Sequence, residues 1–221
     1  MAGHVLRLLE DRLVPGAGAA LPALNRVLYV LAGDISLAAG TERRRLGAGG
    51  AWYGRAACSV EAGDEGATVL RWELAGGDGA GGGIGGPGID SRAVLSHPID
   101  LAPGQAYLMR CDRVDFAPGG EARPHRHQGG GIRRLIAGEL EVRIAGHESR
   151  TMKPGDAWFE SGAEAVHALA SPSSATAFIR VSILPAAIRG RSSIVYLDPA
   201  DAHVTPRRYT LFVDEPIELP R

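Results

Sequence analysis

The chain repeats itself once, and this internal repeat limits the folds open to it more than any other feature. The segment RVLYVLAGDISL, which starts at Arg26, matches GIRRLIAGELEV, which starts at Gly131, at an offset of 105 residues. A repeat of this length is too long for a solenoid unit and predicts a duplicated domain. Three further matches keep the same order along the chain: Asp11-Arg12-Leu13 with Asp112-Arg113-Val114, Ala51-Trp52-Tyr53 with Ala157-Trp158-Phe159, and Leu70-Arg71-Trp72 with Ile179-Arg180-Val181.

The segments within each copy have the character of short strands. They are apolar or alternating, as in DAWFE and ATAFIRVSIL, and Gly or Pro interrupts them at short intervals. The chain holds 31 glycines and 14 prolines, about a fifth of its residues and below the range of about 25–30 % that marks low-complexity chains. With 45 % hydrophobic residues there is also material for a core. These features predict an all-β protein built as sandwiches or barrels of antiparallel strands.

A Gly-rich stretch, AGGDGAGGGIGGPGID, separates the two copies. A phosphate-binding loop needs a helix directly after it, and here Pro87 and Gly88 follow instead. We therefore interpret the stretch as a linker. The expected parts are a first barrel over residues 1–75, a linker over 76–92, and a second barrel with a C-terminal extension over 93–221.

Charge and composition argue against several partner classes. The net charge of −1 gives no basic excess for binding nucleic acid or an anionic membrane. No apolar run approaches the roughly 18 residues that span a bilayer, and Arg7 and Glu10 lie where a signal peptide would be uncharged. Two cysteines, Cys58 and Cys111, are typical of a reducing compartment. We expect a cytoplasmic protein with a small-molecule substrate or ligand, and a homodimer is compatible with the sequence.

Three histidines of the second copy carry the clearest chemistry. His125 and His127 are two residues apart, so on an extended strand both rings project from one face. His167 follows 40 residues later on another expected strand. Three neutral imidazoles converging on one point, with coordination positions left open, suit a catalytic divalent metal. The competing interpretation is three unrelated core or surface histidines.

These residues resemble the two motifs of the cupin superfamily. The Pro-Gly-Asp turn of the second motif, followed by a strand and a histidine, is matched by Pro154-Gly155-Asp156 and His167. The resemblance covers residues 100–185 and reaches the first copy only through the repeat. It implies a bicupin, two tandem cupin barrels of the jelly-roll or double-stranded β-helix type. The spacing of the first motif is reproduced by Gly119, His125, His127, residue 131 and Gly138.

The resemblance also implies a metal site, with one departure from the family pattern. Gly131 stands where the family usually has a carboxylate ligand. The implied site is three histidines, His125, His127 and His167, as in a minority of cupin dioxygenases, with an open position for substrate or water. Gln128 is an alternative source of a ligand atom there. The implied cofactor is one divalent transition metal, Fe, Ni, Zn or Mn, and the sequence does not distinguish among them.

The first copy has no comparable set of ligands. The positions opposite His125 and His127 fall near Ala20 to Pro22, and Glu61 lies opposite His167. A single oxygen ligand does not hold a transition metal that takes three or more protein donors. We expect the first barrel to be degenerate and metal-free.

Arg133 is the predicted substrate-binding residue. If the strand keeps its alternation from position 131, Arg133 faces the barrel interior. Its guanidinium suits a carboxylate or enolate on a bound substrate. Two alternatives remain: a bulge in GGGIRR that turns Arg133 outward, and an internal ion pair with Glu160 or Glu164.

Two functional classes fit these features. The first is a metal-dependent cupin enzyme acting on a small, oxygenated, anionic metabolite, with dioxygenase-like C–C cleavage favoured over isomerisation or hydrolysis. The second is a non-catalytic, metal-dependent small-molecule binding or sensor protein. The second class is favoured by the lack of an acidic general base within the HxH segment and by the degenerate first copy. The sequence does not identify the catalytic residues.

Overall fold

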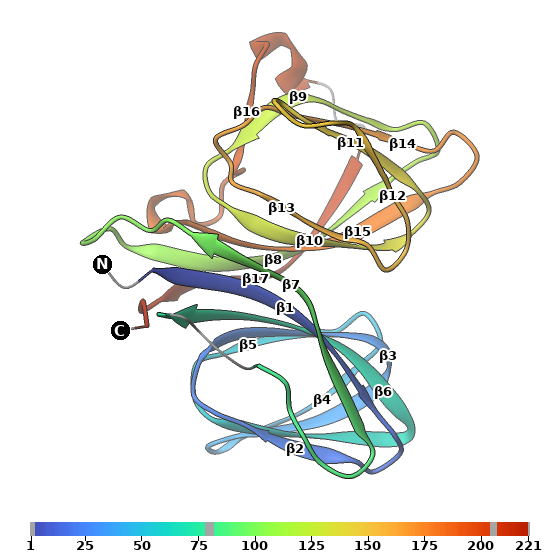
Figure 1. The fold of residues 1–221 in the computed structure, drawn as a ribbon, viewed down its shortest axis with the longest axis vertical. Helices are drawn as coiled ribbons and strands as arrows, with labels where there is room; N and C mark the ends of the chain where they lie inside the picture. The colour runs from blue at the N-terminus through green and yellow to red at the C-terminus, as the bar shows by residue number, and fades with distance from the viewer. Residues whose placement is uncertain (1–2, 78–81, 204–206, 221) are drawn as a thin grey trace. The chain divides into compact units, whose positions relative to one another are not determined.

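The computed structural model describes residues 3–77, 82–203 and 207–220, and its regular structure is almost entirely β-strand (Figure 1). The expected all-β class is therefore confirmed. The chain divides into two compact units, the first formed by Met1–Pro103 with Ile217–Arg221 and the second by Gly104–Pro216. No helix among the described residues is long and apolar enough to cross a membrane.

The first unit is built on one sheet. Its strands follow the order β4-β3-β6-β1-β7, with β2 paired to β6 and β5 paired to β3. Alternate side chains of β3, among them Leu28 and Val30, pack with Trp52 of β5 in a buried apolar core. The strands are β1 (His4–Leu13), β2 (Gly18–Leu21), β3 (Asn25–Ala39), β4 (Glu42–Gly47), β5 (Ala51–Gly54), β6 (Cys58–Gly76) and β7 (Ile89–Ile99).

The second unit contains two five-stranded sheets, ordered β13-β10-β15-β8-β17 and β12-β11-β14-β9-β16. In Figure 1 these strands form a ring around the core of the unit, which includes Phe116, Leu140 and Phe178. Two short 3-10 helices, Ala186–Ile188 and Pro199–His203, flank β16. The strands are β8 (Tyr107–Phe116), β9 (Glu121–His127), β10 (Gly131–Ala137), β11 (Leu140–Ile144), β12 (Arg150–Met152), β13 (Ala157–Glu160), β14 (Val166–Ala170), β15 (Thr176–Pro185), β16 (Ile194–Tyr196) and β17 (Arg207–Ile217).

The sequence repeat reappears in the strand pairing. The path β5-β3-β6-β1-β7 of the first unit has its counterpart in β13-β10-β15-β8-β17 of the second. Leu28 of β3 pairs with Trp52 of β5, and Arg133 of β10 pairs with Trp158 of β13. The residues of these two pairs are related by the offsets of 105 and 106 found in the sequence, so these two matched segments occupy matched places in the two units.

Gly33 and Gly138, which the repeat aligns, have the same backbone conformation. Both have a φ of 71°. A Cβ at Gly33 would lie 2.0 Å from the carbonyl oxygen of Gly66, and a Cβ at Gly138 would lie 2.4 Å from that of Ala175. Only glycine combines a positive φ with so close an approach to another backbone. The same bend therefore lies within β3 of the first unit and directly after β10 of the second.

The structure corrects the expected domain boundaries of 1–75, 76–92 and 93–221. Strand β7, Ile89–Ile99, pairs antiparallel with β1 along its whole length, so residues 93–99 belong to the first unit. The last residues, from Ile217 onward, also belong to the first unit. The sequence IDSRAVLSHPI mixes polar and apolar residues, and only Ile99 of it is fully buried. Because so few of its side chains are buried, this strand has almost no hydrophobic periodicity from which it could be predicted.

Candidate functional site

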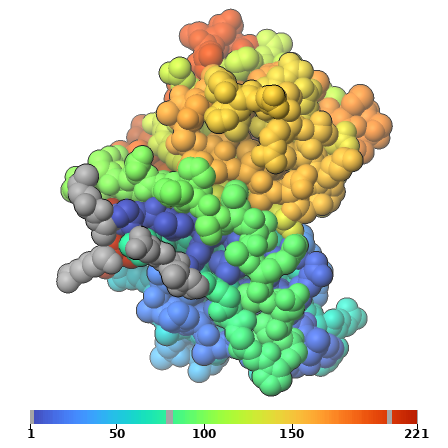
Figure 2. Space-filling view, viewed as in Figure 1, coloured from blue at the N-terminus to red at the C-terminus, as the bar shows by residue number. Residues whose placement is uncertain are grey.

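A small cavity lies inside the second unit. Its volume is about 30 Å³, above the roughly 10–15 Å³ that a cavity needs to hold one water molecule. In Figure 2 the yellow and orange residues of β11 to β14 cover the side of the unit turned to the viewer. One end of the cavity is apolar, with Val114, Phe116, Leu140 and Phe178. The other end is polar, with His125, His127, Arg133, Glu160, Arg180, Arg207 and Tyr209.

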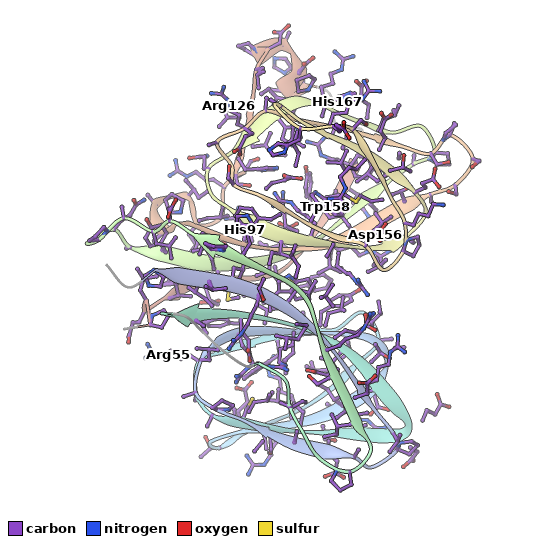
Figure 3. All side chains as sticks on the ribbon, viewed as in Figure 1. Arg55, His97, Arg126, Asp156, Trp158 and His167 are labelled. Atoms are coloured by element: carbon purple, nitrogen blue, oxygen red, sulfur yellow. The ribbon has the colours of Figure 1, made fainter. Side chains whose placement is uncertain are left out.

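Strand β9 brings the first two histidines to this cavity. His125 is 4 % exposed and His127 is 9 % exposed, whereas Arg126 between them is exposed on the opposite face (Figure 3). The two rings meet edge to face, with centroids 4.8 Å apart. Both imidazoles therefore share one face of the strand, as their spacing predicts.

His167 does not join them. Strand β14 turns Val166 and Ala168 into the cavity, so the His167 side chain projects from the other face. There its Nε2 lies 2.7 Å from Oε1 of Glu121, and Figure 3 labels it on this strand, away from Trp158 in the interior. Val166 pairs with His125 across β9 and β14. The interior position expected of the third histidine thus belongs to its neighbour, because one step along a strand reverses the face.

The residues around the two imidazoles do not fit the expected metal centre. A Cβ at Gly131 would lie 2.4 Å from Oγ of Ser182, so no ligand side chain has room there. Gln128 is exposed and donates to the carbonyl oxygen of Ser192. In the described parts of the chain, no group of three or more His, Cys, Asp or Glu side chains is arranged to hold a metal ion. The three-histidine site is therefore not formed by these side chains.

Arg133 faces the interior, but the carboxylate that it meets is the protein's own. Its side chain is 1 % exposed, and Nη2 lies 2.7 Å from Oε2 of Glu160. Nη1 donates to the carbonyl oxygen of Gly131 at 2.5 Å. Burial lowers the pKa of Arg133 to about 10, so the guanidinium remains charged at neutral pH. Of the alternatives left open by the sequence, the structure shows the ion pair with Glu160, and this pair would have to open before Arg133 held a substrate.

Glu160 lies at the centre of the polar end. Its Oε1 accepts a hydrogen bond from Nε1 of Trp158 at 2.8 Å, and its Oε2 lies 3.3 Å from Nε2 of His127. Burial acts to raise the pKa of Glu160, but the charge of Arg133 and the hydrogen bonds from His127 and Trp158 outweigh it. The pKa of Glu160 is therefore held well below its usual range, and the side chain is a carboxylate.

The two imidazoles are neutral. Burial lowers the pKa of His125 to about 4 and that of His127 to about 3. Nδ1 of His125 lies 2.6 Å from the carbonyl oxygen of Arg123. Because a carbonyl oxygen only accepts, Nδ1 carries the ring hydrogen and Nε2 keeps the lone pair. His125 thus contributes a hydrogen-bond acceptor and base to the polar end of the cavity.

Several residues that line this cavity were not among those predicted from the sequence. Arg180 binds Asp112 through two hydrogen bonds, and its match to Arg71 in the repeat was the available signal. Arg207 and Tyr209 come from β17. That strand lies in the part of the chain described from the sequence only as an extension, and its exposed residues carry little hydrophobic period.

The first unit fills the equivalent place with an ion pair. Arg26 pairs with Glu73 in the register at which Gly131 pairs with Ser182 in the second unit. The guanidinium donates to Oε1 of Glu73 from Nε at 3.1 Å and from Nη2 at 2.9 Å, and both side chains are buried. Glu61, the expected counterpart of His167, is exposed. That this unit binds no metal stays a prediction.

Residues 112–183, which include the polar end of the cavity up to Arg180, match the family described as "Cupin domain". Similar solved structures include a two-residue deletion variant of Bacillus subtilis oxalate decarboxylase, with 13 % identity and a TM-score of 0.65 over 92 % of this chain and 77 % of that one. A tryptophan-to-phenylalanine variant of the same enzyme has 15 % identity and a TM-score of 0.65 over 92 % and 78 %. At these identities the likeness shows the fold alone. No curated protein matches the sequence.

Proposed function

We propose that the chain is a bicupin, with one cupin barrel in each unit, and that the second barrel is an enzyme acting on a small oxygenated anion by proton transfer. The shared strand order and matched pairs of the two units support the duplication. The observation that carries the catalytic part is the neutral His125, whose Nδ1 is bound to Arg123 and whose Nε2 is left as a base.

Proton transfer uses only side chains that are already in place. Nε2 of His125 takes a proton from a carbon next to a substrate carbonyl, and the electron pair of that C–H bond moves onto the carbonyl oxygen to form an enolate. When the deprotonated carbon carries a hydroxyl group, the intermediate is an enediolate. Moving the hydroxyl proton to the other oxygen and returning the carbon-bound proton to the former carbonyl carbon then completes an isomerisation without any co-reactant. A bound anion makes His125 a stronger base, because a nearby negative charge favours the imidazolium.

Isomerisation therefore fits these side chains better than the dioxygenase-like cleavage expected from the sequence. Cleavage of that kind relies on a redox-active metal held by several protein ligands. His167 faces away from the cavity and Gly131 has no room for a ligand, so these side chains do not assemble such a centre. A small carboxylate as substrate is in keeping with the oxalate named for the structural neighbours.

A second candidate is binding of the anion without chemistry. The cavity of about 30 Å³ admits one end of a ligand and not the whole of it. A ligand held by its anionic end, with its body outside the cavity, suits a sensor or carrier as well as an enzyme.

Hydrogen exchange separates these two candidates. The purified protein is incubated in D₂O with small oxo-carboxylates such as pyruvate and acetoacetate, and loss of the C–H signals next to the carbonyl is followed by proton NMR. We expect the wild type to accelerate this loss for one of them, and His125→Asn to reduce the rate roughly 100-fold or more. His147→Asn is the matched control, because His147 is exposed. Binding without exchange would support the second candidate, and equal rates for wild type and His125→Asn would contradict the first.

A further inference from the structure

Arg207, the first residue of β17, has no carboxylate partner among the described residues. Its Nη2 donates to the hydroxyl of Tyr196 at 3.1 Å and its Nε donates to the hydroxyl of Tyr209. The guanidinium also lies over the Tyr209 ring, 5.6 Å from the centroid. Its Nη1 is buried and has no hydrogen-bond partner within the described part of the chain. The hydroxyl groups of the two tyrosines thus fix the guanidinium, while its Nη1 has no hydrogen-bond partner among the described residues.

Each of the other two arginines that line the cavity is paired with a carboxylate. Arg133 is paired with Glu160 at 2.7 Å. Arg180 is paired with Asp112 through Nε at 3.1 Å and Nη2 at 2.7 Å. Arg207 has no such partner among the described residues, so it gives this end one positive charge that no carboxylate balances. A cation withdrawn from water is costly unless an anion or well-placed dipoles meet it.

We propose that Arg207 is the anchor for a carboxylate group of the ligand, which it binds through Nη1, and that Tyr196 and Tyr209 hold its guanidinium in position. This inference rests on the proposed function and assigns it a ligand class, a small carboxylate. The small volume of the cavity, about 30 Å³, favours a planar carboxylate over the bulkier tetrahedral phosphate. Arg207, rather than Arg133, is then the residue that recognises the anion.

The body of the ligand has a place next to the anchor. A pocket of about 240 Å³ shares Arg180, Ile194 and Tyr209 with the cavity. Its wall also includes the side chains of Ser193 and Leu211. Charged side chains, Arg110, Asp112 and Arg191, line it as well. The pocket thus combines charged and hydroxyl groups with aliphatic surface, which suits a short carbon chain that carries oxygen atoms.

Calorimetric titration of the whole protein with sodium formate and sodium acetate tests the anchor, at constant ionic strength so that screening is unchanged. We expect the wild type to bind at least one of them, and Arg207→Gln to weaken the affinity roughly tenfold or more, because a charged hydrogen bond is lost. Arg207→Lys keeps the charge without the fork and is expected to lie between the two. Arg208→Gln is the matched control: it removes the same charge from the next residue, whose side chain is 81 % exposed.

Tyr196→Phe gives a second measurement if Arg207→Gln fails to fold. It removes the hydroxyl that fixes Nη2 and is expected to weaken acetate or formate binding a few-fold. Equal affinity for wild type and Arg207→Gln, absence of formate and acetate binding to the wild type, or tighter binding of inorganic phosphate would each overturn the proposal. If Arg207→Gln binds normally while His125→Asn abolishes hydrogen exchange, the proposed function stands and the anchor lies elsewhere. The reverse outcome keeps the anchor and removes proton transfer.

Discussion

Arg71 binds Asp11 through two hydrogen bonds, Nε to Oδ2 at 2.7 Å and Nη2 to Oδ1 at 3.1 Å. Arg180 and Asp112 form the same two-point ion pair in the second unit, and all four side chains are buried. By strand register the counterpart of Asp112 is Leu9, two residues before Asp11. A displacement of two residues keeps a side chain on the same face of a strand, which is why both copies retain the pair.

Removing the carboxylate of either pair is expected to destabilise the protein unequally. Asp112→Asn leaves Arg180 buried without an opposite charge, which typically costs about 3–5 kcal/mol of unfolding free energy. Asp11→Asn is expected to cost less, because Nη1 of Arg71 also donates to Glu73 at 2.7 Å. Urea unfolding of both variants measures the difference. Glu215→Gln is the control, since it breaks a solvent-exposed pair with Arg189 and should cost about 1 kcal/mol or less. Equal losses for the two aspartates would contradict the role given to Glu73.

Glu160→Gln is expected to be strongly destabilising for a related reason. It removes the charge opposite the buried Arg133, and we expect a loss of about 3–5 kcal/mol. The double variant Arg133→Met with Glu160→Gln removes both charges and should regain part of that loss. Chemical unfolding of the two variants and the wild type tests this. A double variant no more stable than the single one would show that the hydrogen bond from Trp158, rather than the ion pair, holds Glu160 in place.

The stability of the protein is expected to fall as the pH is lowered from about 6.5, where imidazoles of an unfolded chain titrate. Burial lowers the pKa of His125 to about 4 and that of His127 to about 3. Between these pH values the unfolded state binds more protons than the folded state, so the free energy of unfolding decreases with falling pH. At higher pH the imidazoles are neutral in both the folded and the unfolded state, so they no longer make the free energy of unfolding depend on pH.

Unfolding free energies at pH 7, 6 and 5 measure this dependence. His125→Asn removes one of the two groups, so its slope should be smaller than that of the wild type by up to about 1.4 kcal/mol per pH unit. His147→Asn changes an exposed imidazole and should leave the slope unchanged. Identical slopes for all three proteins would mean that His125 is not held neutral in the folded state.

His167→Ala is expected to leave the second unit almost unaffected. The side chain is on the outer face, paired with the half-exposed Glu121, so its loss should change the unfolding free energy by about 0.5 kcal/mol or less. Formate binding, hydrogen exchange and the divalent metal content of the purified protein should equal those of the wild type. A variant that lost a stoichiometric metal ion, measured by elemental analysis, would restore the three-histidine site expected from the sequence.

Whether the orientation of a histidine could be predicted from the sequence depended on the distance over which strand alternation had to be followed. His125 and His127 are adjacent positions of one face, so their common direction needed no knowledge of the rest of the fold. His167 is separated from them by turns and a register shift, and each of these can reverse the face. The sequence VHALA is compatible with either face of the strand pointing inward. The apolar Leu169 favoured the face that also carries His167, but the side chain of Leu169 is partly exposed.

The internal repeat could be recognised in the sequence for a different reason. Matched segments at nearly constant offsets need no assignment of faces, and the pairs Leu28 with Trp52 and Arg133 with Trp158 bear them out. The partner of Arg133 could be narrowed to Glu160 or Glu164 but not chosen, because that choice depends on the tertiary register of β10 and β13. Arg207 carried no signal, since an arginine near the end of a chain is most often solvated.

The close approach of β15 to Gly131 has a consequence for how this site can change over evolutionary time. Any side chain at position 131 would meet Oγ of Ser182 at 2.4 Å and the carbonyl oxygen of Val181 at 2.5 Å. A mutation that introduced a carboxylate there would first encounter the backbone of the neighbouring strand, and a single substitution does not readily move a backbone in the middle of a sheet. With this gap closed, a ligand side chain at position 131 is out of reach by one mutational step. Later change in the ligand atoms of this cavity is then confined to positions other than 131.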